Sequence, residues 1–435
     1  MKRTITRRDF LAVSGSAALT TVLTGCNFLV GSERQASGGK DNATVWDIST
    51  GEEQELLENL VKRFNDDHDI STTVQFFQND PYKNKLRVSM GAGNPPDIFY
   101  GWGGGILKDY VDAGKVYDIT GEIDTGKYFP SVMNGVTFDD KVYGVPKAGM
   151  QPVVFYYNKP IFEENSLSIP KTWSELLGLV EQLKETGITP ISLAGQNKWP
   201  YLMYEEYLVN RVGGPEPFQG VVNNEPEAWS DPAFIEANTM IQELVAMGAF
   251  PDGFTALNYD TGQSTSLLYS GKAATQLMGS WDYADMLSSA PEFIEQGNLG
   301  WFDFPAVEGG EGDPQNVAGN LTNFYSVTKA SNAKEASLTF LEDGIMSNFF
   351  INGLIDLGLV PPVEGIESKL QETGNPEWLL YVYNLAREAP YFDLSWDQAL
   401  PPEPAQELLT NLDRLFLREI TPRQFSENMN KTMES

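Results

Sequence analysis

One apolar segment near the middle of the chain most constrains the fold. Residues 153–157 are β-branched and aromatic, a composition typical of a buried strand, and they read VVFYY. Pro146 and Pro160 bound this segment, and proline cannot continue a central strand because it lacks a backbone N–H. The chain on each side of it reads as an α/β unit. The segment is therefore either an ordinary buried strand or the strand that carries the backbone from one lobe into a second.

The first part of the chain predicts a β-α-β unit. Strands are expected over residues 43–48, 72–77 and 97–100. A helix is expected between the first two strands, because Thr50-x-x-Glu53 has the spacing of a capping box. Strands joined by crossover helices favour a mainly parallel sheet, and such sheets bind ligands beyond the carboxyl ends of their strands.

The later part of the chain predicts more elements of the same kinds. Helices are expected from Thr172, with Gly187 as the stop, and from Asp231-Pro232, with Gly248 as the stop. Residues 298–305 and 320–328 are expected to form strands that return to the first lobe, while the residues after 331 form mostly helices of the second lobe. Trp173 and Trp378 begin amphipathic helices and are expected to be packing residues.

Composition excludes several classes of function. The 435 residues suffice for two or three domains, and 60 acidic against 30 basic residues give a net charge of −30. This charge argues against nucleic-acid binding, which needs a basic surface. One cysteine and one histidine allow no intrachain disulfide and no Cys/His zinc site. We therefore expect no metal and no cofactor.

The first 42 residues have the composition of an export leader and a tether. Residues 1–25 carry paired arginines, Arg7-Arg8, and a short apolar run, so they resemble a twin-arginine signal peptide. Residues 23–26 read LTGC and resemble a lipobox, which implies a lipid on Cys26. The alternative is a secreted protein with an incidental cysteine. Residues 31–42 are small and polar, and residues 26–42 are expected to form a flexible tether.

Several motifs occur in an order that resembles one known family. They are Val145-Pro146, YYNK at residues 156–159, PKTWSEL at residues 170–176, and the segments at residues 267–281 and 331–343. Together they resemble the extracellular solute-binding proteins of family 1, the sugar-binding lipoproteins of ABC importers. The resemblance implies a type II periplasmic-binding-protein-like α/β fold with two lobes, a hinge and a ligand cleft. Lobe 1 would comprise residues 43–150 and 302–330, and lobe 2 residues 151–301 and 331–435.

The predicted site follows from sugar chemistry and from the resemblance. Sugars pack their C–H faces on aromatic rings and pair their hydroxyls with carboxylates and amides. Trp102 lies among glycines that leave its face open, although a covered loop residue would fit the same pattern. Trp281 follows a predicted strand, and Trp199 opens a predicted helix. The resemblance supports stacking by Trp281 and implies further contacts from the remaining candidates: Trp46, Asp47, Gln151, Asn320, Trp396 and Asp397. Asn320 follows a single glycine where the family usually has a pair.

The resemblance implies the extracellular binding component of an ABC transporter, a monomer lipid-anchored to the outer face of the cell membrane. It would capture a mono- or oligosaccharide and deliver it to permease subunits without any enzymatic step. Two alternatives remain open. A receptor for a cationic solute such as a polyamine would also combine acids with aromatic residues, and a secreted carbohydrate-active enzyme needs only two carboxylates.

Overall fold

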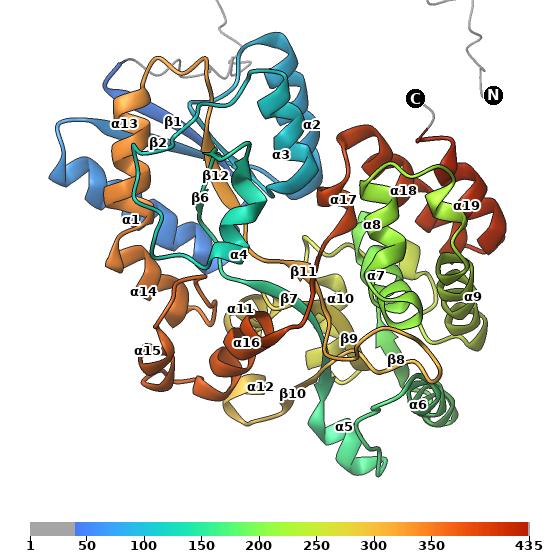
Figure 1. Ribbon diagram of the computed structural model, residues 1–435. Helices are drawn as coiled ribbons and strands as arrows, with labels where there is room; N and C mark the ends of the chain where they lie inside the picture. The colour runs from blue at the N-terminus through green and yellow to red at the C-terminus, as the bar shows by residue number, and fades with distance from the viewer. Residues whose placement is uncertain (1–39, 434–435) are drawn as a thin grey trace, which may run out of the picture. The chain divides into compact units, whose positions relative to one another are not determined.

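The computed structural model describes residues 40–433 (Figure 1). The predicted signal peptide, Cys26 and most of the predicted tether lie outside the described residues. Within the described range, none of the helices combines the length and hydrophobicity that crossing a bilayer requires. Two main β-sheets organise this part of the chain, and helices flank both of them.

The N-terminal sheet has five strands in the order β2-β1-β3-β12-β6. β1 is parallel to β2 and β3, whereas β12 is antiparallel to β3 and β6. The bounds are β1 (Asn42–Asp47), β2 (Ser71–Phe76), β3 (Ile98–Gly101), β6 (Val145–Pro146) and β12 (Phe324–Val327). A separate two-stranded ribbon consists of β4 (Thr137–Phe138) and β5 (Lys141–Val142).

The central sheet has the order β13-β11-β7-β9-β8, and β10 also pairs with β7. Its strands are β7 (Gln151–Asn158), β8 (Thr189–Ser192), β9 (Ala273–Gly279), β10 (Leu299–Phe302), β11 (Val317–Asn320) and β13 (Phe392–Leu394). β7 contains the apolar segment and runs antiparallel to β9, β10 and β11. The α/β class is confirmed, but the sheets are mixed rather than mainly parallel. A strand that arrives directly from the other sheet has no crossover helix to make it parallel.

One group of helices surrounds the N-terminal sheet. Figure 1 shows α1 and α13 on one side of this sheet, with α2 and α3 on the other. The group comprises α1 (Gly51–Asp67), α2 (Asn79–Ala92), α3 (Gly104–Asp112), α4 (Pro130–Met133), α13 (Lys334–Thr339), the π-helix η5 (Phe340–Ile345) and α14 (Asn348–Asp356). A 3₁₀ turn, η1 (Asn134–Val136), follows α4.

The remaining helices are mainly those of the central sheet. They are α5 (Lys159–Glu164), α6 (Trp173–Thr186), α7 (Trp199–Gly213), α8 (Glu216–Val222), α9 (Pro232–Met247), α10 (Gln263–Tyr269), α11 (Asp282–Ser289), α12 (Pro291–Glu295), α15 (Glu367–Gln371), α16 (Pro376–Glu388), α17 (Trp396–Ala399), α18 (Pro402–Phe416) and α19 (Pro422–Asn430). The 3₁₀ turns of this part are η2 (Gly195–Asn197), η3 (Ala228–Ser230) and η4 (Phe254–Ala256).

The predicted helix boundaries at α6 and α9 are confirmed. The Thr172 side chain accepts a hydrogen bond from the Glu175 N–H, and Gly187 ends α6 with a left-handed φ of 78°. The Asp231 side chain accepts a hydrogen bond from the Ala233 N–H at the start of α9. Each cap satisfies a backbone donor that the first turn of a helix leaves free.

The capping box predicted at Thr50 is wrong. α1 begins at the predicted place, but the Thr50 side chain makes no capping hydrogen bond. The Glu53 carboxylate instead pairs with the buried ammonium of Lys147, 2.8 Å away. A tertiary ion pair has therefore replaced the local contact that the sequence spacing predicted.

Two parts of the expected chain path differ from the structure. β10 pairs with β7 in the central sheet, so residues 298–305 do not return to the N-terminal sheet. Residues 321–323 make that return instead, between β11 and β12. α13 then packs on β1, β2 and β12, and α14 packs on α1, so this stretch after residue 331 belongs with the N-terminal sheet. Helical periodicity predicted these helices but could not say which sheet they cover.

Candidate functional site

A cavity of about 520 Å³ lies between the N-terminal sheet and the central sheet. Its walls are mainly segments that follow the carboxyl ends of parallel strands, as expected for open α/β sheets. Residues 48–53 follow β1, Trp102 follows β3, Trp199 lies beyond β8, and Trp281 follows β9. Chain segments that are distant in the sequence thus meet around one space.

Three tryptophans contribute to the aromatic part of the cavity wall, which also contains Tyr100, Tyr259 and Tyr269. Trp199 and Trp281 lie on the central-sheet side with ring centroids 6.1 Å apart. Trp102 lies on the other side, packed edge-on against Tyr100 with a centroid distance of 5.4 Å. The Trp199 Nε1 group is buried and has no hydrogen-bond partner among the described residues. The wall therefore offers apolar ring surface and, at Trp199, a buried indole donor without a partner.

Glycine allows the Trp102 loop to approach the far side of the cavity. A Cβ atom placed on Gly105 would lie 2.3 Å from the Ala399 carbonyl oxygen, a distance that real atoms do not adopt. The start of α3 therefore fits directly against the end of α17. This contact holds Trp102 near Gln398, which lines the same cavity.

An amide cluster forms another part of the wall. The Gln151 Oε1 atom accepts hydrogen bonds from the side-chain amides of Asn320, at 3.2 Å, and Asn323, at 3.0 Å. The Asn323 amide also donates to the Tyr100 hydroxyl. The side-chain oxygens of Asn320, Asn323 and Gln398 are buried and have no partner among the described residues. Because buried polar atoms are normally paired, these three acceptors are available to a ligand.

Two carboxylates and a phenol meet at the start of α11. The Tyr259 hydroxyl lies 2.8 Å from Asp285 Oδ2 and 3.2 Å from Asp282 Oδ1. Burial, together with the charge of the neighbouring Asp285, raises the pKa of Asp282 to about 8. Desolvation by the surrounding cavity wall, together with the charges of Glu53 and Asp260, raises the pKa of Asp285 to about 6, while solvent in the cavity still reaches its side chain. Asp285 lines the cavity, whereas Asp282 lies fully buried behind it.

Polar contacts bridge the two sides of the cavity. The Lys83 ammonium on α2 lies 3.3 Å from the Asp397 carboxylate on α17, and also 5.0 Å from the centroid of the Trp102 ring. The Asn197 amide of η2 donates to the Asp80 carboxylate of α2 at 3.2 Å. These contacts join elements that flank different sheets.

Six of the nine ligand-binding residues predicted from the sequence line the cavity: Trp102, Gln151, Trp199, Trp281, Asn320 and Asp397. The structure thus brings together the candidates from the Trp102 loop, the apolar strand and the turn after β9. Their roles in binding remain predictions.

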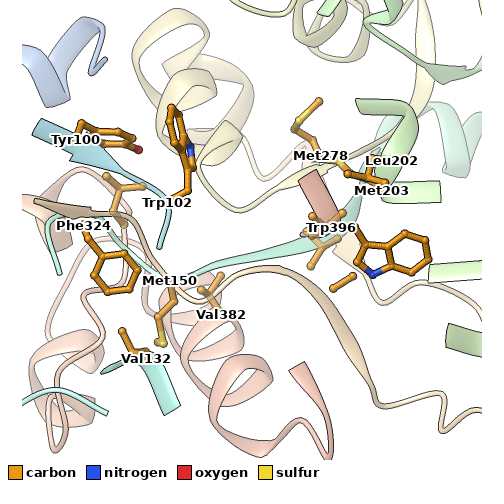
Figure 2. Packing of buried hydrophobic residues seen from close by; sticks show 14 of the residues in the cluster. Tyr100, Trp102, Val132, Met150, Leu202, Met203, Met278, Phe324, Val382 and Trp396 are labelled. Carbon is orange, nitrogen blue, oxygen red and sulfur yellow. The ribbon is translucent and has the colours of Figure 1, made fainter. Parts of the chain in front are cut away.

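The other three predicted residues do not line the cavity. The prediction for Trp396 is wrong, because its side chain is fully buried and stacks on Phe218 at a centroid distance of 4.2 Å. Figure 2 shows Trp396 well apart from Trp102 and Tyr100. Trp46 is buried against Phe77, and Asp47 is buried in an ion pair with Lys147. Both residues lie at the end of β1, as predicted, but their side chains point to opposite faces of the sheet and each is buried on its own face.

Sequence reasoning missed several residues of the cavity wall: Lys83, Tyr259, Asp260, Asp285, Asn323 and Gln398. Asn323 could have been found, because it lies three residues after the candidate Asn320 on the segment that returns to the N-terminal sheet. Tyr259 and Asp260 lie in a loop without periodicity, so no pattern pointed to them. Among residues 40–433, no group of acidic, histidine or cysteine side chains has the arrangement of a metal site.

Comparison with known proteins gives concordant matches. The family model described as bacterial extracellular solute-binding protein matches residues 49–342. An uncharacterized ABC transporter extracellular-binding protein of Pyrococcus horikoshii is 30% identical over 287 residues, which are 62% of this chain and 63% of that protein. The matched region is thus less than two thirds of that relative. The multiple sugar-binding protein of Streptococcus mutans is 25% identical over 335 residues, 75% of this chain and 76% of that protein.

A solved structure has a similar fold. The structure of a chitin oligosaccharide binding protein aligns with a TM-score of 0.80 and 25% sequence identity, covering 90% of this chain and 98% of that chain. This likeness confirms the solute-binding fold predicted from the sequence. Because the family model covers more than half of the residues, the chain belongs to the bacterial extracellular solute-binding proteins.

Proposed function

We propose that this protein is the sugar-capturing component of an ABC transporter. The observation that carries the proposal is the cavity of about 520 Å³, in which tryptophan faces and unpaired amide oxygens surround one space. Small-molecule sites commonly have volumes of roughly 300–1,000 Å³. The printed descriptions of a multiple sugar-binding relative and a chitin oligosaccharide binding structure support the same class of ligand.

The wall chemistry suits a carbohydrate. The indole faces of Trp102, Trp199 and Trp281 replace water on the apolar C–H faces of a sugar ring. The side-chain oxygens of Asn320 and Asn323 accept hydrogen bonds from sugar hydroxyls. A sugar that supplies these bonds also removes the cost of burying unpaired acceptors.

Binding is coupled to closure of the two parts of the chain around the sugar. The Lys83–Asp397 pair and the Asn197–Asp80 hydrogen bond cross the cavity and form when it closes. A lipid on Cys26 holds the protein at the outer face of the membrane, the tether over residues 26–42 gives it reach, and a monomer presents the closed form to permease subunits. No chemical step on the sugar is part of this function.

A ligand screen tests the proposal. Thermal shift across neutral and amino sugars, followed by isothermal titration of each hit, is expected to give one-to-one binding by at least one mono- or oligosaccharide. The sugar released from the heat-denatured complex is expected to be chemically unchanged. Recovery of cleaved sugar would indicate a carbohydrate-active enzyme. Binding of spermidine without binding of any sugar would indicate a polyamine receptor.

A further inference from the structure

The cavity has an unequal balance of charge. The acidic side chains in its wall are Glu52, Glu53, Asp260, Asp285 and Asp397, and the single basic side chain among its lining residues is Lys83. These acids come from both sides of the cavity, since the glutamates lie in the first turn of α1 and Asp285 lies on α11. α1 and α11 are in contact, so their charges face one common space.

Two of the five acids already have cationic partners. Asp397 pairs with Lys83 at 3.3 Å, and Glu53 pairs with Lys147 at 2.8 Å. Among the ion pairs of the described residues, none involves Glu52, Asp260 or Asp285. Lys83 is close enough to lower the pKa of Asp260, but burial and the charge of Asp80 raise it overall.

Unpaired acceptors also line the wall. The buried side-chain oxygens of Asn79, Asn320, Asn323 and Gln398 have no partner among the described residues, and the hydrogen bonds around Gln151 fix the orientation of the Asn320 and Asn323 amides. The buried Trp199 indole is an unpaired donor, and Lys83 and several hydroxyl groups are further donors of the wall. Ligand groups that face the amide oxygens must therefore be hydrogen-bond donors.

Closure makes this imbalance costly for a neutral ligand. Burying a carboxylate without a partner is unfavourable, because the charged form loses its hydration. A neutral sugar bound beside Asp260 and Asp285 would displace the water around these carboxylates without supplying an opposite charge. A protonated amine would supply both the missing charge and several N–H donors in one group.

We infer that the ligand of this cavity is a cationic amino sugar, with its ammonium group beside Asp285, Asp260 and Glu52. This inference rests on the proposed function and specifies the substrate class of the same site. The tryptophans take the ring faces, the amide oxygens take hydroxyl groups, and the unpaired carboxylates take the amine.

A matched pair of disaccharides tests the inference. Glucosamine disaccharide and its N-acetylated counterpart share the same ring framework and differ in charge at the amine. Isothermal titration at neutral pH and low salt is expected to show about tenfold tighter binding of the amine form, since one charge-assisted hydrogen bond is gained. Added salt is expected to weaken binding of the amine form and to leave the acetylated form nearly unchanged.

Variants of the acidic residues test whether their carboxylates cause the difference in affinity between the two disaccharides. Asp285→Asn is expected to weaken binding of the amine form about tenfold and to leave the acetylated form unchanged. Glu52→Gln is a second variant with the same expected direction, and it stays usable if Asp285→Asn does not fold, because Glu52 is exposed. Asp252→Asn is the control, since Asp252 is exposed and lies outside the cavity wall. It is expected to change neither affinity.

Each other outcome has a distinct meaning. Equal or tighter binding of the acetylated disaccharide overturns the inference and leaves sugar capture standing. An equal loss of both affinities in Asp285→Asn also overturns it, because Asp285 would then contact hydroxyls rather than the amine. Binding of spermidine with no binding of any sugar in the screen overturns the proposed function itself.

Discussion

The ammonium of Lys147 lies 3.3 Å from a carboxylate oxygen of Asp47, and solvent reaches neither side chain. Asp47 also accepts a hydrogen bond from the Tyr325 hydroxyl at 2.6 Å. Lys147 extends from the end of β6 toward Glu53 at the cavity. Burial alone would lower the pKa of Lys147, but the charges of Asp47 and Glu53 raise it. The ion pair therefore joins the segment between β6 and β7 to the end of β1.

Replacement of Lys147 by methionine is expected to destabilise the fold strongly. The change leaves the Asp47 carboxylate buried without its cation, a loss of about 3–5 kcal/mol in the free energy of unfolding. Urea denaturation measures this loss. Lys108→Met is the control, because the Lys108–Asp112 pair lies on the surface, and it is expected to leave the midpoint nearly unchanged. Equal effects of the two variants would contradict the structural role of Lys147.

Trp281→Ala is expected to weaken sugar binding while the fold survives. The ring of Trp281 lines the cavity, so its removal costs binding area, by about 2 kcal/mol or roughly thirtyfold in affinity. Trp378→Ala is the packing control, because Trp378 is 1% exposed and stacks on Tyr283. That variant is expected to lose about 3–5 kcal/mol of stability. Titration and thermal melting of both variants separate the two roles. Unchanged affinity in folded Trp281→Ala would exclude stacking there.

Glu205 predicts a pH dependence of stability. Burial raises its pKa from 4.5 to about 8 in the folded protein, while a hydrogen bond from Asn238 opposes the shift. The folded chain therefore keeps a proton that the unfolded chain loses near its ordinary pKa of 4.5. This contribution to stability is complete below pH 4.5 and is lost as the pH rises through about 8.

Glu205→Gln is expected to flatten that pH dependence, because glutamine does not titrate. The slope removed is at most about 1.4 kcal/mol per pH unit between the two pKa values. Urea denaturation in mildly acidic and mildly alkaline buffers measures it. Glu292→Gln is the control, since Glu292 is exposed on α12 and its substitution is expected to leave the slope unchanged. A slope that persists in Glu205→Gln would show that other buried acids produce it.

Closure of the cavity predicts a change in size on binding. Small-angle scattering is expected to show a smaller radius of gyration at ligand saturation than in the free protein. Lys83→Met removes the pair that bridges α2 and α17, so it is expected to weaken ligand affinity while the melting temperature of the free protein changes little. An unchanged radius at saturation would contradict closure.

Cys26→Ser tests membrane anchoring. Loss of the thiol removes the attachment point for a lipid, so the variant is expected in the soluble extracytoplasmic fraction while the parent stays with the membrane. Fractionation and immunoblotting of both forms measure this. A variant that remains with the membrane would point to another means of attachment.

Local chemistry made some elements predictable. The run of β-branched and aromatic residues at 153–157 predicted β7, because such residues favour the strand conformation. The caps at Thr172 and Asp231 predicted where α6 and α9 begin. Trp102 was predicted to line a cavity because its neighbours are glycines, and it does line one, although Tyr100 and Lys83 cover most of its ring and leave it 7% exposed.

Other features depend on contacts that no local pattern carries. Trp396 and Asp397 are adjacent, yet Trp396 packs on Phe218 in the interior and Asp397 faces the cavity. The side on which each residue lies is set by the packing of α17 against α3 and α7, which come from other parts of the sequence. Likewise, Glu53 has the spacing of a cap but pairs with Lys147 instead. Long-range pairing decided both outcomes.

The position of the Gln151 amide has a kinetic consequence. Gln151 begins β7 immediately after one crossing between the sheets, and its partners Asn320 and Asn323 flank another. In the proposed closure, atoms next to the pivot move least, so we expect the floor of the cavity to keep its geometry whether the cavity is open or closed. Groups at the rim, such as Lys83 and Asp397, which lie 3.3 Å apart here, are expected to meet only after rotation. We therefore expect the floor to govern how fast a ligand is accepted and the rim to govern its residence time.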